Sequence, residues 1–180
     1  MNLLVGKFLF WFNKIIKRNS YYRSRLVHKF ENSNLWGLGI FVLRGKSLDL
    51  GLLDPSKNFL LKHNFNILDA RKLTNSETAR ISKNMRGSDW KDGLPVALLV
   101  VFDKNPVRID NSLVHKYPEL DNHNLLIKLE MRKFLNSKVK SDNISNFVHA
   151  TDNSFKALNY LSIISERYKN KIIDSIKSLK

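Results

Sequence analysis

Hydrophobic and polar positions follow two rhythms along the chain, one typical of strands and one typical of amphipathic helices. Apolar runs bounded by turn residues predict strands over residues 38–43, 65–73, 95–102 and 144–148. The run over 95–102 is the most apolar and is expected to form the central strand. Helical periodicity and capping residues predict helices over residues 54–63, 75–84, 124–135 and 154–166, and from 168 onward.

Two of these helices carry clear start signals. Asp54 is expected to cap the first one, with Pro55 at its first helical position. Asn153 or Ser154 is expected to begin the helix after the fourth strand. Between the third strand and the third helix, the segment with Pro106 is expected to be irregular.

The order strand, helix, strand, strand, helix, strand is that of a split βαβ arrangement. We therefore expect an α+β fold of the ferredoxin-like type, with helices on one face of an antiparallel four-stranded sheet. The folded domain is expected over residues 35–166. Helical extensions flank it, a basic amphipathic one over residues 1–34 and a basic one over residues 167–180.

The first extension contains an apolar stripe at helical spacing, formed by Leu4, Phe8, Trp11 and Ile15. Such a helix either packs against the domain or a second subunit, which we favour, or rests on anionic lipid. It lacks a basic start and a cleavage site, so no signal peptide is expected. No apolar stretch approaches the roughly 20 residues of a spanning helix, so we expect a soluble or peripheral, cytoplasmic protein.

The charge balance changes the list of partners. With 31 Lys and Arg against 16 Asp and Glu, the formal net charge is +15. This favours polyanions: nucleotide phosphates, nucleic acid or anionic lipid. The chain has no cysteine, which excludes disulfides and thiolate metal sites. Its five histidines show no metal-ligand spacing. The 43% of hydrophobic residues suffices for a real core.

One string points to specific chemistry. A histidine closes an apolar run and a carboxylate follows three residues later, in Asn146-Phe147-Val148-His149-Ala150-Thr151-Asp152. A rigid strand end with a helix start behind it is the setting that a phospho-accepting histidine needs. The alternative is that His149 is only the neighbour of a helix cap.

This string resembles the active-site signature of the nucleoside diphosphate kinase family, which reads Asn, two apolar residues, His, Gly or Ala, Ser or Thr, Asp. Residues 146–152 fill every place. Residues 51–65 resemble the family's Gly-Leu-Val run, first helix and the opening of its second strand. Residues 94–98 resemble its Gly-Pro-Val-Val-Ala strand. The three matches occur in the family's order.

The resemblance implies a phosphotransferase that moves the terminal phosphate of a nucleoside triphosphate to a histidine, and then to a nucleoside diphosphate or related acceptor. It implies that His149 is the nucleophile, that Asn146 binds the sugar or the transferred phosphate, and that Thr151 and Asp152 support them. It also implies Mg²⁺ (magnesium) carried with the bound nucleotide, and a homo-oligomer.

Further phosphate ligands follow from the same comparison. Arg132 resembles an arginine that holds phosphate oxygens in a fork, with a solvent-facing helix arginine as the alternative. Arg44 stands where the family has a lysine. Lys116 lies in the stretch that positions the nucleotide, and is otherwise an ordinary surface residue. Trp90 offers a stacking face for the base, or anchors its loop.

The chain departs from the family at the glutamate that orients the histidine, which Tyr160 replaces. This departure keeps a second function open, a non-catalytic module that binds nucleotide or a partner on the same fold. A third reading uses the basic residues at both ends of the chain, which are expected to attract nucleic acid or an anionic membrane without sequence specificity.

Overall fold

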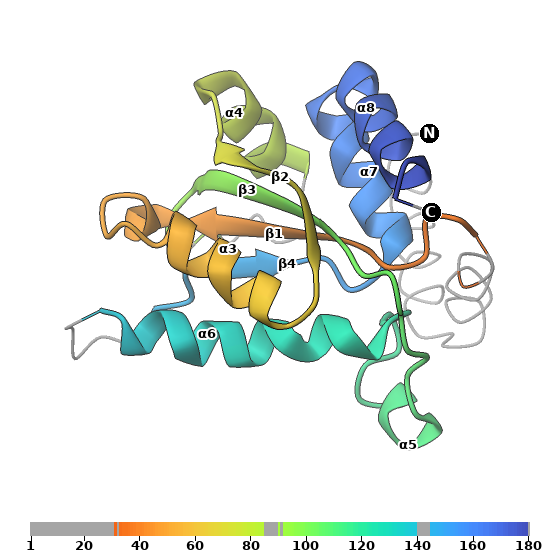
Figure 1. The fold of residues 1–180 in the computed structure, drawn as a ribbon. Helices are drawn as coiled ribbons and strands as arrows, with labels where there is room; N and C mark the ends of the chain where they lie inside the picture. The colour runs from red at the N-terminus through yellow and green to blue at the C-terminus, as the bar shows by residue number, and fades with distance from the viewer. Residues whose placement is uncertain (1–30, 32, 85–89, 91, 140–144, 180) are drawn as a thin grey trace, which may run out of the picture.

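The computed structural model describes Glu31 and residues 33–84, 90, 92–139 and 145–179. The predicted extension over residues 1–34 lies outside the described residues except at Glu31, Ser33 and Asn34. The fold is α+β, with an open antiparallel sheet of four strands and six α-helices among the described residues (Figure 1).

Two strands buried on both faces form the centre of the sheet. β1 (Leu38–Arg44) and β3 (Pro95–Phe102) pair antiparallel, with Leu38 opposite Phe102 and Leu43 opposite Ala97. A strand that is covered on both faces reads as a continuous apolar run. Both strands were therefore predictable from the sequence, at nearly the observed bounds.

The outer strands complete a sheet in the order β2-β3-β1-β4. β2 (Asn66–Lys72) pairs antiparallel with β3, and β4 (Val148–Ala150) pairs antiparallel with β1. It follows that β1 runs parallel to β2, and β3 runs parallel to β4. Each of these parallel pairs has another strand between its members.

Helices provide the connections and the cover. The α-helices are α3 (Leu53–Lys62), α4 (Asn75–Asn84), α5 (Asn111–Val114), α6 (Ile127–Ser137), α7 (Ser154–Ile164) and α8 (Glu166–Lys177). Two short 3-10 helices, η1 (Gly45–Ser47) and η2 (His123–Leu126), follow β1 and precede α6. None of the helices in the described part of the chain has the length and apolar character that crossing a bilayer requires.

The prediction that helices cover one face of the sheet is wrong, because they cover both. Phe41 and Leu99 face a core that includes Leu60 of α3 and Met131 of α6. The alternate strand positions face a second core, which contains Leu161 of α7 together with residues of α4 and α8. In Figure 1, α3 lies with α6, and α4 lies near α7 and α8. Strands that are apolar on both sides require cover on both sides.

Several elements differ from the prediction in their bounds or caps. β4 starts only at Val148, later than predicted. The predicted start at Ile144 lies outside the described residues, and the Asn146 carbonyl accepts from the Arg44 side chain. The first helix is capped by Leu52, and Asp54 lies in its first turn. The short helix α5 replaces part of the expected irregular segment. The cap of α7 is confirmed as Asn153.

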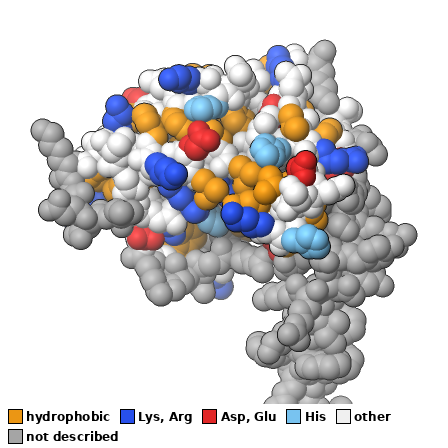
Figure 2. Space-filling model, turned by 90° about the horizontal axis from the view of Figure 1, so that it is seen from below, with side chains coloured by type: hydrophobic (Ala, Val, Ile, Leu, Met, Phe, Trp, Pro, Cys, Tyr) orange, Lys and Arg blue, Asp and Glu red, His pale blue; other side chains and the backbone are white. Residues whose placement is uncertain are grey.

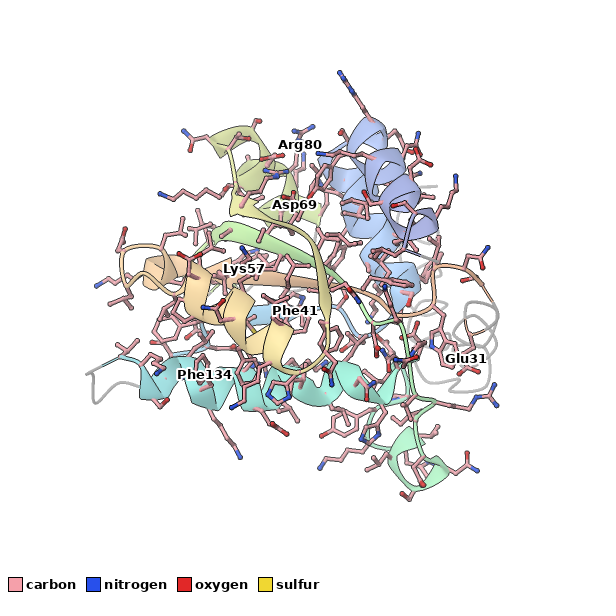
Figure 3. The ribbon with its side chains drawn as sticks, in the orientation of Figure 1. Glu31, Phe41, Lys57, Asp69, Arg80 and Phe134 are labelled. Atoms are coloured by element: carbon pink, nitrogen blue, oxygen red, sulfur yellow. The ribbon has the colours of Figure 1, made fainter. Side chains whose placement is uncertain are left out.

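A polar cluster fixes α8 to β2 and α4. Arg71 on β2 forms a forked ion pair with Glu77 on α4, at 2.8 and 2.9 Å, and this hydrogen-bonded pair holds the pKa of Glu77 at about 2. Tyr168 on α8 lies over the Arg71 guanidinium at 5.0 Å and donates its hydroxyl to Asp69. Asp69 lies on β2, where Figure 3 labels it. Ile172 extends the second core from the same helix. The basic C-terminal helix α8 therefore packs against β2 and the second core.

Candidate functional site

His149 is the middle residue of the edge strand β4 and lies opposite Val42 of β1. Its neighbours Val148 and Ala150 belong to the core formed with α3 and α6. Because side chains alternate along a strand, His149 points to the other face, which Val42 also faces. The edge strand thus holds the imidazole half-buried at the rim of the second core.

The residues after His149 tie the strand to its neighbour. The Thr151 backbone N–H donates to the Ile40 carbonyl at 2.9 Å, and the Thr151 hydroxyl accepts the Ile40 N–H at 3.0 Å. Asn153 then caps α7 by accepting the N–H of Lys156 at 2.7 Å. Thr151 is buried and supports the backbone. These hydrogen bonds fix the backbone that follows His149 and so hold the histidine in position.

Two glycines bring a second segment to the end of β1. Gly45 and Gly93 both have left-handed backbone, with φ of +56° and +99°. A Cβ on Gly93 would lie 2.4 Å from the Gly45 Cα, and a Cβ on Gly45 would lie 2.3 Å from the Asp92 carbonyl oxygen. The Gly45 N–H also donates to the Leu94 carbonyl at 2.9 Å. Only glycine permits this approach, which places Asp92 and Trp90 beside Arg44.

Arg44 is the buried cation at the centre of this contact. Its Nε and Nη2 donate to the Asn146 carbonyl at 3.0 and 2.7 Å, and Nη2 also contacts the Asp92 carboxylate at 3.2 Å. Burial lowers the pKa of Arg44, Asp92 opposes this effect, and Arg132 lowers the pKa further. The sequence analysis predicted Arg44 as a phosphate ligand. The structure shows that Arg44 has a carboxylate partner, Asp92, which the sequence analysis did not identify.

Trp90 forms one wall of the site. Its ring meets the His149 imidazole edge-on, with centroids 6.3 Å apart, and the Arg44 guanidinium lies 5.7 Å from its ring centroid. Its indole N–H donates to the Ser82 carbonyl at the end of α4 at 3.2 Å. This hydrogen bond supports the alternative that Trp90 anchors its loop. The Trp90 ring also contacts two of the candidate residues, His149 and Arg44.

Arg132 reaches the site from α6, which covers the sheet face opposite to the one that His149 faces. Its Nε donates to the Val148 carbonyl at 3.3 Å, so the side chain turns toward the strand and not to solvent. Burial lowers the pKa of Arg132, and Asp152 and Asp92 oppose that effect. The side-chain Oδ1 of Asn146 is buried and has no hydrogen-bond partner among the described residues. A ligand with a donor group would satisfy this oxygen.

The surroundings keep His149 neutral. Burial lowers its pKa from 6.5 to about 4, with Arg44 as the next contributor and Arg132 and Lys128 adding to the effect, while Asp152 opposes it. No side chain in the described ranges hydrogen-bonds the imidazole ring. At neutral pH the ring therefore carries a free nitrogen lone pair in a cationic environment.

Lys128 belongs to this cluster, although the sequence analysis did not single it out. It lies one helical turn before Arg132 on α6, and its Nζ contacts the Asp152 carboxylate at 2.6 Å. Lys156 contacts the other oxygen of Asp152 at 2.6 Å and also pairs with Glu119. Burial would raise the pKa of Asp152, but the two lysines lower it to about 2. The i, i+4 spacing of Lys128 and Arg132 was the available signal.

Two further predicted site residues take different places, Lys116 apart from His149 and Tyr160 in the second core. Lys116 follows α5, at the opposite end of the molecule from the C-terminal end of β1 in Figure 1, and its Nζ lies 5.4 Å from the Tyr117 ring centroid. Tyr160 on α7 is buried in the core on the sheet face to which His149 points. The structure thus brings Arg44, Trp90 and Arg132 to His149, and leaves Lys116 apart.

In the described part of the chain, no group of three or more His, Cys, Asp or Glu side chains is placed to hold a metal ion. Asp92 and Asp152 are each paired with cationic side chains.

The basic character is spread over the surface seen in Figure 2, where Lys and Arg side chains lie scattered among hydrophobic, acidic and neutral ones. On α8, Lys169 pairs with Glu166 and Lys177 pairs with Asp174. Binding of nucleic acid or an anionic membrane stays a prediction, as does the homo-oligomer. Comparison of the chain with protein-family profiles and with curated protein sequences finds no match.

Proposed function

We propose that this chain is a phosphotransferase of the nucleoside diphosphate kinase type on a ferredoxin-like fold. The strand order β2-β3-β1-β4, with two crossovers that each skip one strand, supports that fold. The signature over residues 146–152 supports the family. The single observation that carries the proposal is the neutral, half-buried imidazole of His149, which contacts the Trp90 ring and on which the charges of Arg44 and Arg132 act.

The proposed reaction has two steps. A lone pair on the imidazole of His149 forms a bond to the terminal phosphorus of a nucleoside triphosphate, and the bond to the bridging oxygen breaks, so the nucleoside diphosphate leaves with both electrons. The phosphoryl group then passes from the histidine to a second nucleoside diphosphate or related acceptor. Low pKa suits the first step because no proton must leave the attacking nitrogen.

The cationic groups supply the remaining requirements. Arg44 and Arg132 would hold the oxygens of the transferred phosphoryl group, which carry the negative charge in the transition state. The unsatisfied Oδ1 of Asn146 would accept a hydrogen bond from a sugar hydroxyl. Mg²⁺ is expected to arrive with the nucleotide and to neutralise part of its charge.

The first step is testable by labelling. Incubation of the full chain with γ-labelled ATP and Mg²⁺ is expected to give a phosphoprotein that is labile in acid and stable in alkali. His149→Ala is expected to remove the label, because the nucleophile is gone. His115→Ala is the matched control, since His115 is exposed and follows α5, and it is expected to keep the label. A wild-type protein that stays unlabelled contradicts the proposal.

The second candidate is a non-catalytic nucleotide-binding module on the same fold. It is favoured by the absence, among described residues, of a hydrogen bond that holds the His149 ring, together with Tyr160 in place of the orienting glutamate. A rise in the thermal unfolding midpoint with ATP or ADP, without any labelling of His149, would support this module over the enzyme. No rise with either nucleotide would remove both candidates.

A further inference from the structure

Asp92 already occupies the cationic centre of the proposed phosphate site. Its carboxylate contacts Arg44 Nη2 at 3.2 Å, and its charge also acts on the guanidinium of Arg132. The charge of Arg132 in turn acts on Arg44. A carboxylate that acts on two arginines stands where an anionic ligand of those arginines is expected to bind.

We propose that Asp92 is an internal counter-anion, which a phosphate group must displace from Arg44 before it can bind there. This inference rests on the proposed function, because it assigns a regulating residue to the same site. Asp92 would then set the affinity of the site for phosphate, by competing from within the chain.

The fold keeps Asp92 in place for this competition. The close approach of Gly45 and Gly93 fixes the backbone on either side of the ion pair, because a Cβ on Gly93 would lie 2.4 Å from the Gly45 Cα and a Cβ on Gly45 would lie 2.3 Å from the Asp92 carbonyl oxygen. An intramolecular ligand held in this way has an effective concentration of millimolar order or higher. A free anion displaces it only by making stronger or more numerous bonds.

The geometry leaves a route for the exchange. Arg44 is almost fully buried, with 8% of its side chain exposed, but Asp92 keeps 36% of its side chain exposed to solvent. Two donors of Arg44 remain committed to the Asn146 carbonyl. The arginine therefore stays in place when the carboxylate turns outward, and a phosphate oxygen can take over the vacated contact.

The competition also explains the type of anion that the site would select. A singly charged carboxylate would replace Asp92 with an equivalent group and gain little. A phosphate chain carries more charge and offers several oxygens to Arg44 and Arg132 at once. The site is thus expected to bind polyphosphates in preference to simple carboxylates.

Isothermal titration of the full chain with inorganic tripolyphosphate at fixed ionic strength tests this inference. Asp92→Asn keeps the size of the side chain and removes its charge, and it is expected to bind about tenfold more tightly than the wild type. Asp92→Glu restores the charge and is expected to bind within about twofold of the wild type. Asp174→Asn is the matched control, because it removes the same charge from an exposed pair on α8.

The possible outcomes separate the two proposals. Equal or weaker binding by Asp92→Asn, while the wild type binds and is labelled on His149, overturns the inference and leaves the proposed function standing. Equal tightening in Asp92→Asn and Asp174→Asn also overturns it, because net charge alone would then be the cause. Absence of binding in the wild type and both Asp92 variants overturns the proposed phosphate site together with the inference. Circular dichroism of each variant verifies that the sheet is intact.

Discussion

At the scale of single residues, the chemistry depends on the protonation state of His149. Burial and the charges of Arg44, Arg132 and Lys128 lower its pKa to about 4. The unfolded chain binds a proton near pH 6.5, so between about pH 6.5 and 4 the folded state binds fewer protons. The contribution of His149 to the free energy of unfolding is therefore constant above pH 6.5 and falls as the pH drops to about 4.

An NMR titration of the imidazole measures this directly. His149 is expected to stay neutral down to about pH 5, and the rate of its phosphorylation is expected to remain level from neutral pH to that point and to fall below it. Arg44→Gln removes the leading charge contribution and is expected to raise the pKa of His149. Arg80→Gln, which changes an exposed arginine on α4, is expected to leave it unchanged. A wild-type value near 6.5 would contradict this description of the site.

At the scale of elements, the site depends on how the turn after β1 meets the segment before β3. Gly93→Ala introduces both a strained backbone and a clash with the Gly45 Cα, and it is expected to lower the free energy of unfolding by about 3 kcal/mol. Gly51→Ala is the matched control, because Gly51 also has positive φ, at +65°, but has no atom near its missing Cβ.

Urea unfolding compares the two variants. Gly51→Ala is expected to lose only about 1 kcal/mol from backbone strain. If both variants lose the same amount, the contact between Gly45 and Gly93 does not hold the two segments together.

The sequence predicted elements best where one local pattern decides the structure. The apolar runs of β1 and β3 and the Asn153 cap of α7 fall in this group. The start of β4 does not fall in this group. Within the predicted strand, the Asn146 carbonyl accepts a hydrogen bond from the Arg44 side chain of β1. Sequence patterns likewise identified His149 and Arg44 as site residues, but they did not identify Asp92 or Lys128. Their roles arise from tertiary contacts between residues 48 and 24 positions apart in the sequence.

At the scale of the whole molecule, different helices cover the two faces of the sheet. α3 and α6 complete one core, and α6 also delivers Arg132 and Lys128 to the outer side of β4. α4, α7 and α8 complete the other core, and the end of α4 holds the indole of Trp90. The candidate site lies where β4 forms the edge of the sheet. Groups carried by elements on both faces therefore act on His149.

The central claim is that His149 carries a phosphoryl group between two nucleotides. The most direct test mixes the full chain with γ-labelled ATP, Mg²⁺ and unlabelled GDP, and follows the label. We expect label to appear first on the protein and then in GTP, and varying both nucleotides to give parallel double-reciprocal lines. His149→Ala is expected to abolish both signals. Label that never leaves the protein, or GTP formed equally well by His149→Ala, would contradict it.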